Sequence, residues 1–232
     1  MGSLHADQTV NTDGFATLGN IALDNSTLDV SENSGGKIYM RSGALQLSNT
    51  AIIKADSKGT GDAQGIDINI RGEAQILAGS YIRSNAASSG AGGLVRFDAD
   101  TLLINGMDAR TGIYSQASST NTGGQAGRVD VRVNNMLQIL DGGRISSSVF
   151  SVGDSGSVAV QAGSLLINRM GASENTGIFS QVGSNSTGGN AGSVEVTVGG
   201  HLEIINGGSI SCLLYTSPSP RDLSTSRMPS SA

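Results

Sequence analysis

The chain contains a 36-residue segment that occurs twice, at a fixed separation of 65 residues. Residues 111–146 read TGIYSQASSTNTGGQAGRVDVRVNNMLQILDGGRIS, residues 176–211 read TGIFSQVGSNSTGGNAGSVEVTVGGHLEIINGGSIS, and 20 of the 36 positions are identical. A chain that repeats itself at a fixed period folds as stacked copies of one unit, because each unit buries its apolar side only against its neighbours. The repeat therefore predicts an elongated stack rather than a globular domain with one central core.

Each 65-residue unit divides into two halves that contain the same three apolar elements. An element in which apolar and polar residues alternate is typical of a strand with one buried face. The first elements are Ile38/Met40, Ile66/Ile68/Ile70, Val95/Phe97/Ala99, Val129/Val131/Val133, Val158/Val160/Ala162 and Val194/Val196/Val198. The second elements are the pairs Leu45/Leu47, Ala74/Ile76, Leu102/Ile104, Leu137/Ile139, Leu165/Ile167 and Leu202/Ile204. The third elements are single isoleucines: Ile53, Ile82, Ile113, Ile145, Ile178 and Ile210.

The spacing of the first elements sets the size of one coil. They begin at residues 38, 66, 95, 129, 158 and 194, so one coil takes about thirty residues. We expect an all-β fold, a parallel β-helix with three short strands per coil and about six regular coils. Before them, Ile21/Leu23 and Leu28/Val30 are expected to form one irregular coil. Length variation, as in Ser118–Thr122 and Ser184–Thr187, is expected at the corners.

The same register predicts which outward-facing charges become neighbours. Stacking places Arg96 between Asp67 and Asp130. One step along the strand, it places Asp98 beside Arg132. Opposite charges on adjacent strands contribute about 0.2–1 kcal/mol each.

Composition excludes several other classes of protein. The net charge is −5, which disfavours binding to nucleic acids or to anionic membranes. The one cysteine is Cys212, so residues 1–211 can form neither a disulfide nor a thiolate metal site. No apolar run is long enough to span a membrane, and residues 1–11 lack the arrangement of a signal peptide. If the parent protein is exported, we expect this chain to be a fragment of it.

The composition changes abruptly after Ser211. All 34 glycines lie before this point, whereas Cys212 and the three prolines lie after it. The segment CLLYTSPSPRD that begins at Cys212 matches the translation of a transposase-library sequencing adapter. We therefore divide the chain into a β-helix at residues 1–211 and a non-native, disordered tail at residues 212–232. Proline is expected to be absent from the first part, because nearly every strand N–H there donates to a neighbouring coil.

The repeat motif GGxAGxVxVxVxxxLxIxxGGxIS, preceded by TGI(Y/F)SQ, resembles the shaft repeats of filamentous-haemagglutinin-like exoproteins. The resemblance covers about Gly35 to Ser211. It implies a right-handed β-helix that is secreted to the bacterial cell surface by an outer-membrane β-barrel transporter and serves adhesion or biofilm formation. The implied binding partners are glycans or proteins of host or neighbouring cells. The family's secretion domain carries Asn-Pro motifs, and these are missing from residues 1–211, which contain no proline.

No residue is predicted to be catalytic, to hold a cofactor or to bind a metal. His5 and His201 are isolated and are interpreted as surface residues. Asp98 and Asp100 could suggest the carboxylate clusters of pectin-cleaving β-helices, but the acidic residues scatter across coils or pair with arginine. The serines that follow the third-element isoleucines form a row, which is interpreted as packing within the stack rather than as a binding face.

Three functions remain open at this point. The leading hypothesis is a non-enzymatic structural shaft that holds an adhesive tip away from the cell. A polysaccharide-processing enzyme of the pectin-lyase type is the second, because a fold alone does not decide function. The third is the stalk of a contact-dependent toxin whose toxic domain lies outside this chain.

Overall fold

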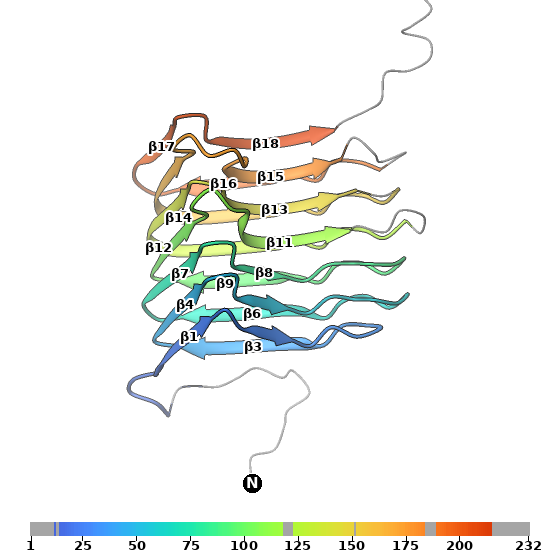
Figure 1. Ribbon diagram of the computed structural model, residues 1–232, viewed down its shortest axis with the longest axis horizontal. Coiled ribbons are helices and arrows are strands. Elements are labelled where there is room, and N and C mark those ends of the chain that lie inside the picture. The colour runs from blue at the N-terminus through green and yellow to red at the C-terminus, as the bar shows by residue number, and fades with distance from the viewer. Residues whose placement is uncertain (1–11, 13, 118–122, 151, 184–188, 215–232) are drawn as a thin grey trace, which may run out of the picture.

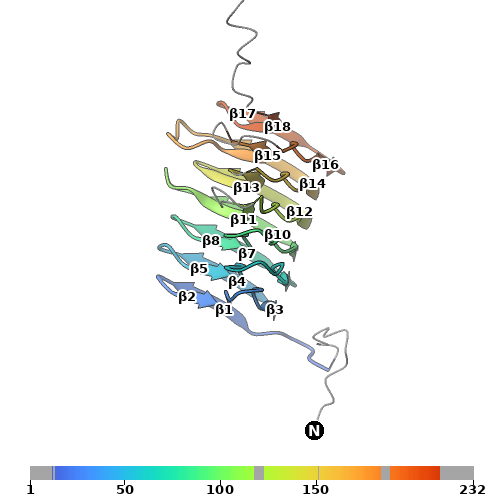
Figure 2. The same cartoon turned by 90° about the vertical axis from the view of Figure 1, so that its right-hand side faces the viewer.

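A computed structural model of the chain describes residues 12, 14–117, 123–150, 152–183 and 189–214. Every regular element in these ranges is a β-strand, and all strand pairs are parallel. The chain winds as a β-solenoid of about six turns, with the coils stacked from the N-terminal to the C-terminal end (Figures 1 and 2). The predicted parallel β-helix is therefore confirmed.

The strands lie on three faces of the solenoid. The first face contains β3 (Lys37–Ser42), β6 (Gly65–Ile70), β9 (Val95–Ala99), the beginnings of β12 (Val129–Leu140) and β14 (Val158–Asn168), and β16 (Val194–Val198). The second face contains β1 (Asn20–Asp24), β4 (Ala44–Ser48), β7 (Glu73–Leu77), β10 (Thr101–Asn105), the ends of β12 and β14, and β17 (Leu202–Ile205). The third face contains β2 (Thr27–Asp29), β5 (Ile52–Lys54), β8 (Tyr81–Arg83), β11 (Thr111–Ala117), β13 (Gly143–Val149), β15 (Gly177–Val182) and β18 (Ser209–Leu214).

The first and second faces are joined into one sheet. In the two coils before the last, β12 and β14 run without interruption from the first face to the second, so the strands form an 11-stranded sheet and a 7-stranded sheet. The register between β12 and β14 shifts between Val133 and Met136, which marks an irregularity at this corner. The three apolar elements of these coils are thus carried by two strands instead of three.

Equivalent aliphatic residues lie directly above one another, as the repeat predicts. Val158 pairs with Val129 on one side and with Val194 on the other. The inward residues of all three faces form one continuous core along the stack. In the first coil Ile21 pairs with Leu45, and Leu28 pairs with Ile53, so this irregular coil follows the same register.

The core is open at the C-terminal coil. Leu165 and Ile167 in β14 are 1% and 0% exposed, whereas their partners Leu202 and Ile204 in β17 are 46% and 40% exposed. Strand β18 continues through Cys212 to Leu214, the first three residues of the tail, in register with β15. Residues 215–232 lie outside the described part, as do the corner segments 118–122 and 184–187.

A smaller apolar cluster fills the narrow edge beyond the third face. It consists of Ala86, Ala117, Ala126, Val149 and Val182, mostly small side chains that suit the tapering space. Next to it the backbones of successive coils come very close. A Cβ at Gly156 would collide with the carbonyl oxygen of Gly127, and one at Gly192 would collide with that of Gly156. This close approach explains why a glycine recurs here in coil after coil.

Long corners on alternate coils contact each other across the shorter corner between them. Asp108 Oδ1 accepts hydrogen bonds from the backbone N–H of Ser173 at 2.7 Å and from its Oγ at 2.8 Å. These bonds lower the pKa of Asp108 below its usual value. The two residues are 65 positions apart, so residues separated by one repeat of the sequence are in direct contact here.

Replacing Ile139 by alanine removes an inward side chain that is completely buried. We expect the free energy of unfolding to fall by about 2–5 kcal/mol, because the loss of buried methyl groups leaves a cavity. The adjacent residue, Gln138, faces outward in the same strand, and Gln138→Ala should change it by no more than about 0.5 kcal/mol. Urea denaturation, monitored by circular dichroism, measures the free energy of unfolding of both variants. Equal losses for the two variants would contradict the assigned inward and outward faces.

Candidate functional site

The outer side of the first face carries most of the charged neighbours that the register predicts. Arg96 pairs with Asp67 in the coil below and with Asp130 in the coil above. Asp98 pairs in the same way with Arg132. Both predicted sets of neighbours are confirmed, and all five side chains face away from the core.

The closest ion pairs on this face differ from the predicted ones. Arg96 Nε donates to Asp98 Oδ2 at 2.9 Å, two positions along its own strand, although Asp67 and Asp130 flank it across the strands. Arg128 pairs with Asp130 in the same i, i+2 arrangement. The distance from Arg132 Nη1 to Asp98 Oδ1 is longer, at 3.7 Å. The hydrogen bond and charge of Asp98 raise the pKa of Arg96 above its usual value.

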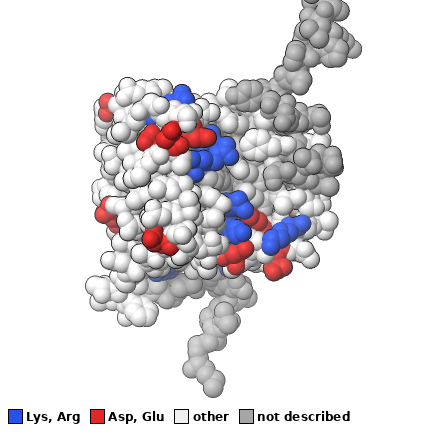
Figure 3. Space-filling model, in the orientation of Figure 1, with Lys and Arg blue, Asp and Glu red and all other residues white. Residues whose placement is uncertain are grey.

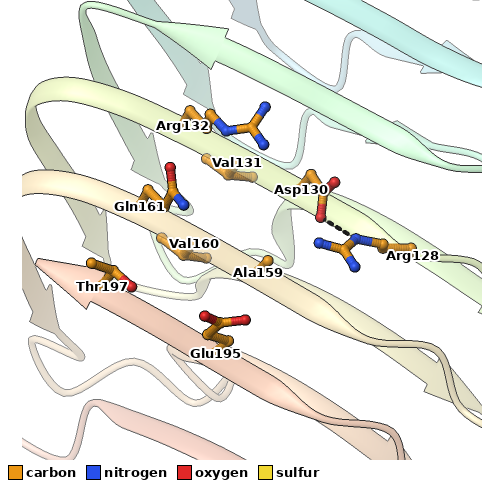
Figure 4. Close-up of a pocket in the computed structure, with 9 residues that line it drawn as sticks. All are labelled: Arg128, Asp130, Val131, Arg132, Ala159, Val160, Gln161, Glu195 and Thr197. Atoms are coloured by element: carbon orange, nitrogen blue, oxygen red, sulfur yellow. Dashed lines mark hydrogen bonds and ion pairs between the residues drawn. The ribbon is translucent and has the colours of Figure 1, made fainter.

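A small hollow lies over β12, β14 and β16 on this outer face. Its volume is about 60 Å³. Figure 4 shows the residues around it: Asp130 and Arg132 from β12, Arg128 directly before this strand, Gln161 from β14 and Glu195 from β16. The ion pair between Arg128 and Asp130 lies along one side of the hollow. The hollow is small and its acidic groups come from separate coils.

A larger hollow of about 600 Å³ lies toward the N-terminal side of the same face. Its lining comes from three successive coils, through β6, β9 and β12 and the residues that follow them: Asn69, Ile70, Arg71, Arg96, Asp98, Ala99, Arg132 and Asn134. Arg132 belongs to both hollows. Sequence reasoning placed Arg96, Asp98 and Arg132 side by side, but it did not predict a hollow or the participation of Arg71, Asn69 and Asn134.

The carboxylates considered as catalytic candidates do not converge. Asp98 is held between Arg96 and Arg132, and Asp100 Oδ1 accepts a hydrogen bond from Asn135 Nδ2 at 2.9 Å. His201 is highly exposed, and its Nε2 lies 3.8 Å from Glu203. His5 lies outside the described residues.

A search of the described ranges finds no group of three or more His, Cys, Asp or Glu side chains arranged to hold a metal ion. These ranges also contain no helix with the length and apolar character needed to cross a bilayer.

The serines of the third face point into the solenoid. Ser84, Ser115, Ser147 and Ser180 are all completely buried. Ser147 Oγ donates to Gly127 O at 2.8 Å, and Ser180 Oγ donates to Gly156 O at 2.9 Å, so they satisfy carbonyl groups on the opposite side of the narrow edge. These serines are interior residues and present no surface to a ligand.

An arginine stacks against an aromatic ring on the outer side of the third face. Ser146 lies between Tyr114 and Phe179 in the register, and Arg144 lies between Gly112 and Gly177. The Arg144 guanidinium is 5.1 Å from the centre of the Phe179 ring, a cation–π contact. The small residues around it leave room for the guanidinium, which explains how a charged side chain becomes only 6% exposed.

Burial changes the electrostatics of this cluster. It lowers the pKa of Arg144 below its usual range, and the nearby charge of Arg110 acts in the same direction. It also raises the pKa of Tyr114 above its usual value of 10.0, although Arg144 opposes this effect. Within the described residues, neither Tyr114 Oη nor Arg144 Nε has a hydrogen-bond partner. The sequence offers no periodic signal for this cluster, because Arg144 stands where the next repeat has Ser209.

The raised pKa of Tyr114 makes stability depend on pH in the alkaline range. The folded state keeps this phenol protonated at pH values where the unfolded chain ionises, so its contribution to stability is complete below pH 10 and is lost as the pH rises toward the folded-state value. Tyr114→Phe should therefore flatten the decline of the melting temperature above pH 10. Melting curves of both proteins, recorded from pH 8 to about pH 12, test this. Parallel declines would contradict the buried phenol.

Comparison of the chain with protein-family models, with curated proteins and with solved structures finds no match. The resemblance to filamentous-haemagglutinin-like exoproteins is a resemblance of the repeat motif alone. The chain is a β-solenoid whose outer first face carries two polar hollows.

Proposed function

We propose that this chain is a shaft segment of a large secreted bacterial surface protein that serves adhesion or biofilm formation. The observation that carries the proposal is the continuous stacking of equivalent residues on each face. Val158 continues the column from Val129 to Val194, and Ile113, Ile145 and Ile178 form an equivalent column on the third face. A structure built in this way gains length without any change to the coils already present.

The open core at the C-terminal coil supports the same proposal. Leu202 and Ile204 expose the apolar surface that the equivalent residues of the inner coils bury. Among the described residues, the strands β16, β17 and β18 also have a strand partner on one side only. Such a surface is suited to the addition of another coil, and left uncovered it favours aggregation.

A non-enzymatic role fits the arrangement of the acidic residues. On the first face Asp67 pairs with Arg41 at 2.7 Å, and Asp98 pairs with Arg96 at 2.9 Å. A general acid and a general base must both reach one substrate bond, and these carboxylates are each held by an arginine instead. The competing proposal, a polysaccharide-processing enzyme, would require free carboxylates that share one groove.

A deletion that keeps the repeat in phase tests the shaft role in the source bacterium. Removing residues 111–175 joins Arg110 to Thr176, which occupies the position of Thr111 in the repeat. We expect surface display and adhesion to persist while the rod shortens by two coils, ~10 Å. Antibody labelling of intact cells and an adhesion assay measure these properties. The control deletion, residues 111–160, breaks the register and should abolish surface display.

Two results would overturn this proposal. One is the absence of antibody labelling on intact cells that express the complete gene. The other is depolymerisation of pectin or a related glycan by the purified chain, measured as newly formed reducing or unsaturated ends, because cleavage would favour the enzyme.

A further inference from the structure

The larger hollow on the first face has an excess of positive charge. Three arginines line it, Arg71, Arg96 and Arg132, against the one carboxylate of Asp98. This gives a local charge of +2 on a chain whose net charge is −5. The acidic residues that flank Arg96 across the strands are already paired, Asp67 with Arg41 and Asp130 with Arg128.

Two of these guanidinium groups have no carboxylate hydrogen bond among the described residues. Arg132 lies 3.7 Å from Asp98, whose other oxygen accepts from Arg96 at 2.9 Å. Arg71 donates to the backbone carbonyl of Phe15 at 3.2 Å and to Thr12, which leaves its charge uncompensated. The two arginines enter the hollow from β12 and from the end of β6, with β9 between them.

Neutral polar groups complete the lining. Asn69 and Asn134 are exposed, and no hydrogen bond to another described residue occupies either side-chain amide. A primary amide donates and accepts at once, which is what a sugar hydroxyl requires. A guanidinium fork binds a carboxylate through two parallel hydrogen bonds.

The lining also argues against a nucleic acid. It contains no aromatic side chain on which a base could stack. Stacking of bases on aromatic side chains contributes much of the affinity of proteins for single-stranded nucleic acid. A lining of guanidinium and amide groups without aromatic rings therefore suits an acidic sugar polymer better.

From these features we infer that the hollow lined by Arg71, Arg96, Arg132, Asn69 and Asn134 binds an acidic polysaccharide that carries carboxylate groups. The glycan lies along the stack across three coils, which are spaced ~4.8 Å apart, close to the length of one pyranose residue. Arg132 and Arg71 each contact the carboxylate of a different uronate residue, and the asparagines contact hydroxyl groups. The site adds a ligand to the proposed shaft and can fail while the shaft role stands.

Isothermal titration calorimetry of the full chain with a defined oligogalacturonate tests this site. We expect saturable binding that weakens at high salt, because exposed charges carry it. The fully methyl-esterified oligomer, with the same rings but no charge, should bind at least about tenfold more weakly. Arg132→Gln should weaken binding of the acidic oligomer by about tenfold or more.

The matched control is Arg110→Gln, which removes the same charge from an exposed corner that does not line the hollow. It should leave the affinity within about twofold of the original. Circular dichroism verifies that both variants fold. The inference is overturned if the acidic oligomer does not bind, if its esterified form binds equally well, if the two variants weaken binding equally, or if single-stranded DNA binds more tightly than the glycan.

Discussion

Parallel pairing between successive coils, with equivalent residues aligned on each face, is the constraint on which the rest of this structure depends. Each inner strand donates to and accepts from the coils above and below it, so every side chain meets its own counterpart one coil away. A column such as Val129, Val158 and Val194 stays buried because all of its members are apolar. The recurring apolar positions, the recurring glycines and the absence of proline before the tail follow from this requirement.

The same register organises the outer surfaces, where repetition is less strict. On the first face it brings arginines and carboxylates into adjacent positions and leaves a basic hollow where the acidic residues are fewer. On the third face, Ser146 between Tyr114 and Phe179 makes space beside the two rings, and Arg144 occupies it. Both features depend on differences between coils, which shows how a repetitive scaffold carries individual sites.

The two-coil period has a structural meaning beyond the strands. Long corners alternate with short ones, and Asp108 reaches Ser173 across the intervening coil. The two residues are 65 positions apart, so this contact spans one repeat unit of two coils rather than a single coil. A shaft built from units of this kind can change in length during evolution while its cross-section stays constant, which fits the function proposed for this chain.

The sequence by itself determined the inward columns, the parallel stack and the outward charge neighbours, because alternation with a period of two assigns every residue of a strand to one face. It did not determine that β12 and β14 pass through a corner, since the path at a corner depends on backbone irregularity rather than on a pattern. It also placed Arg96 beside Asp67 and Asp130 without revealing that Arg96 bonds to Asp98. The hollow and the Arg144 stack were decided only by tertiary structure, because long side chains lean across columns according to the space that their neighbours leave.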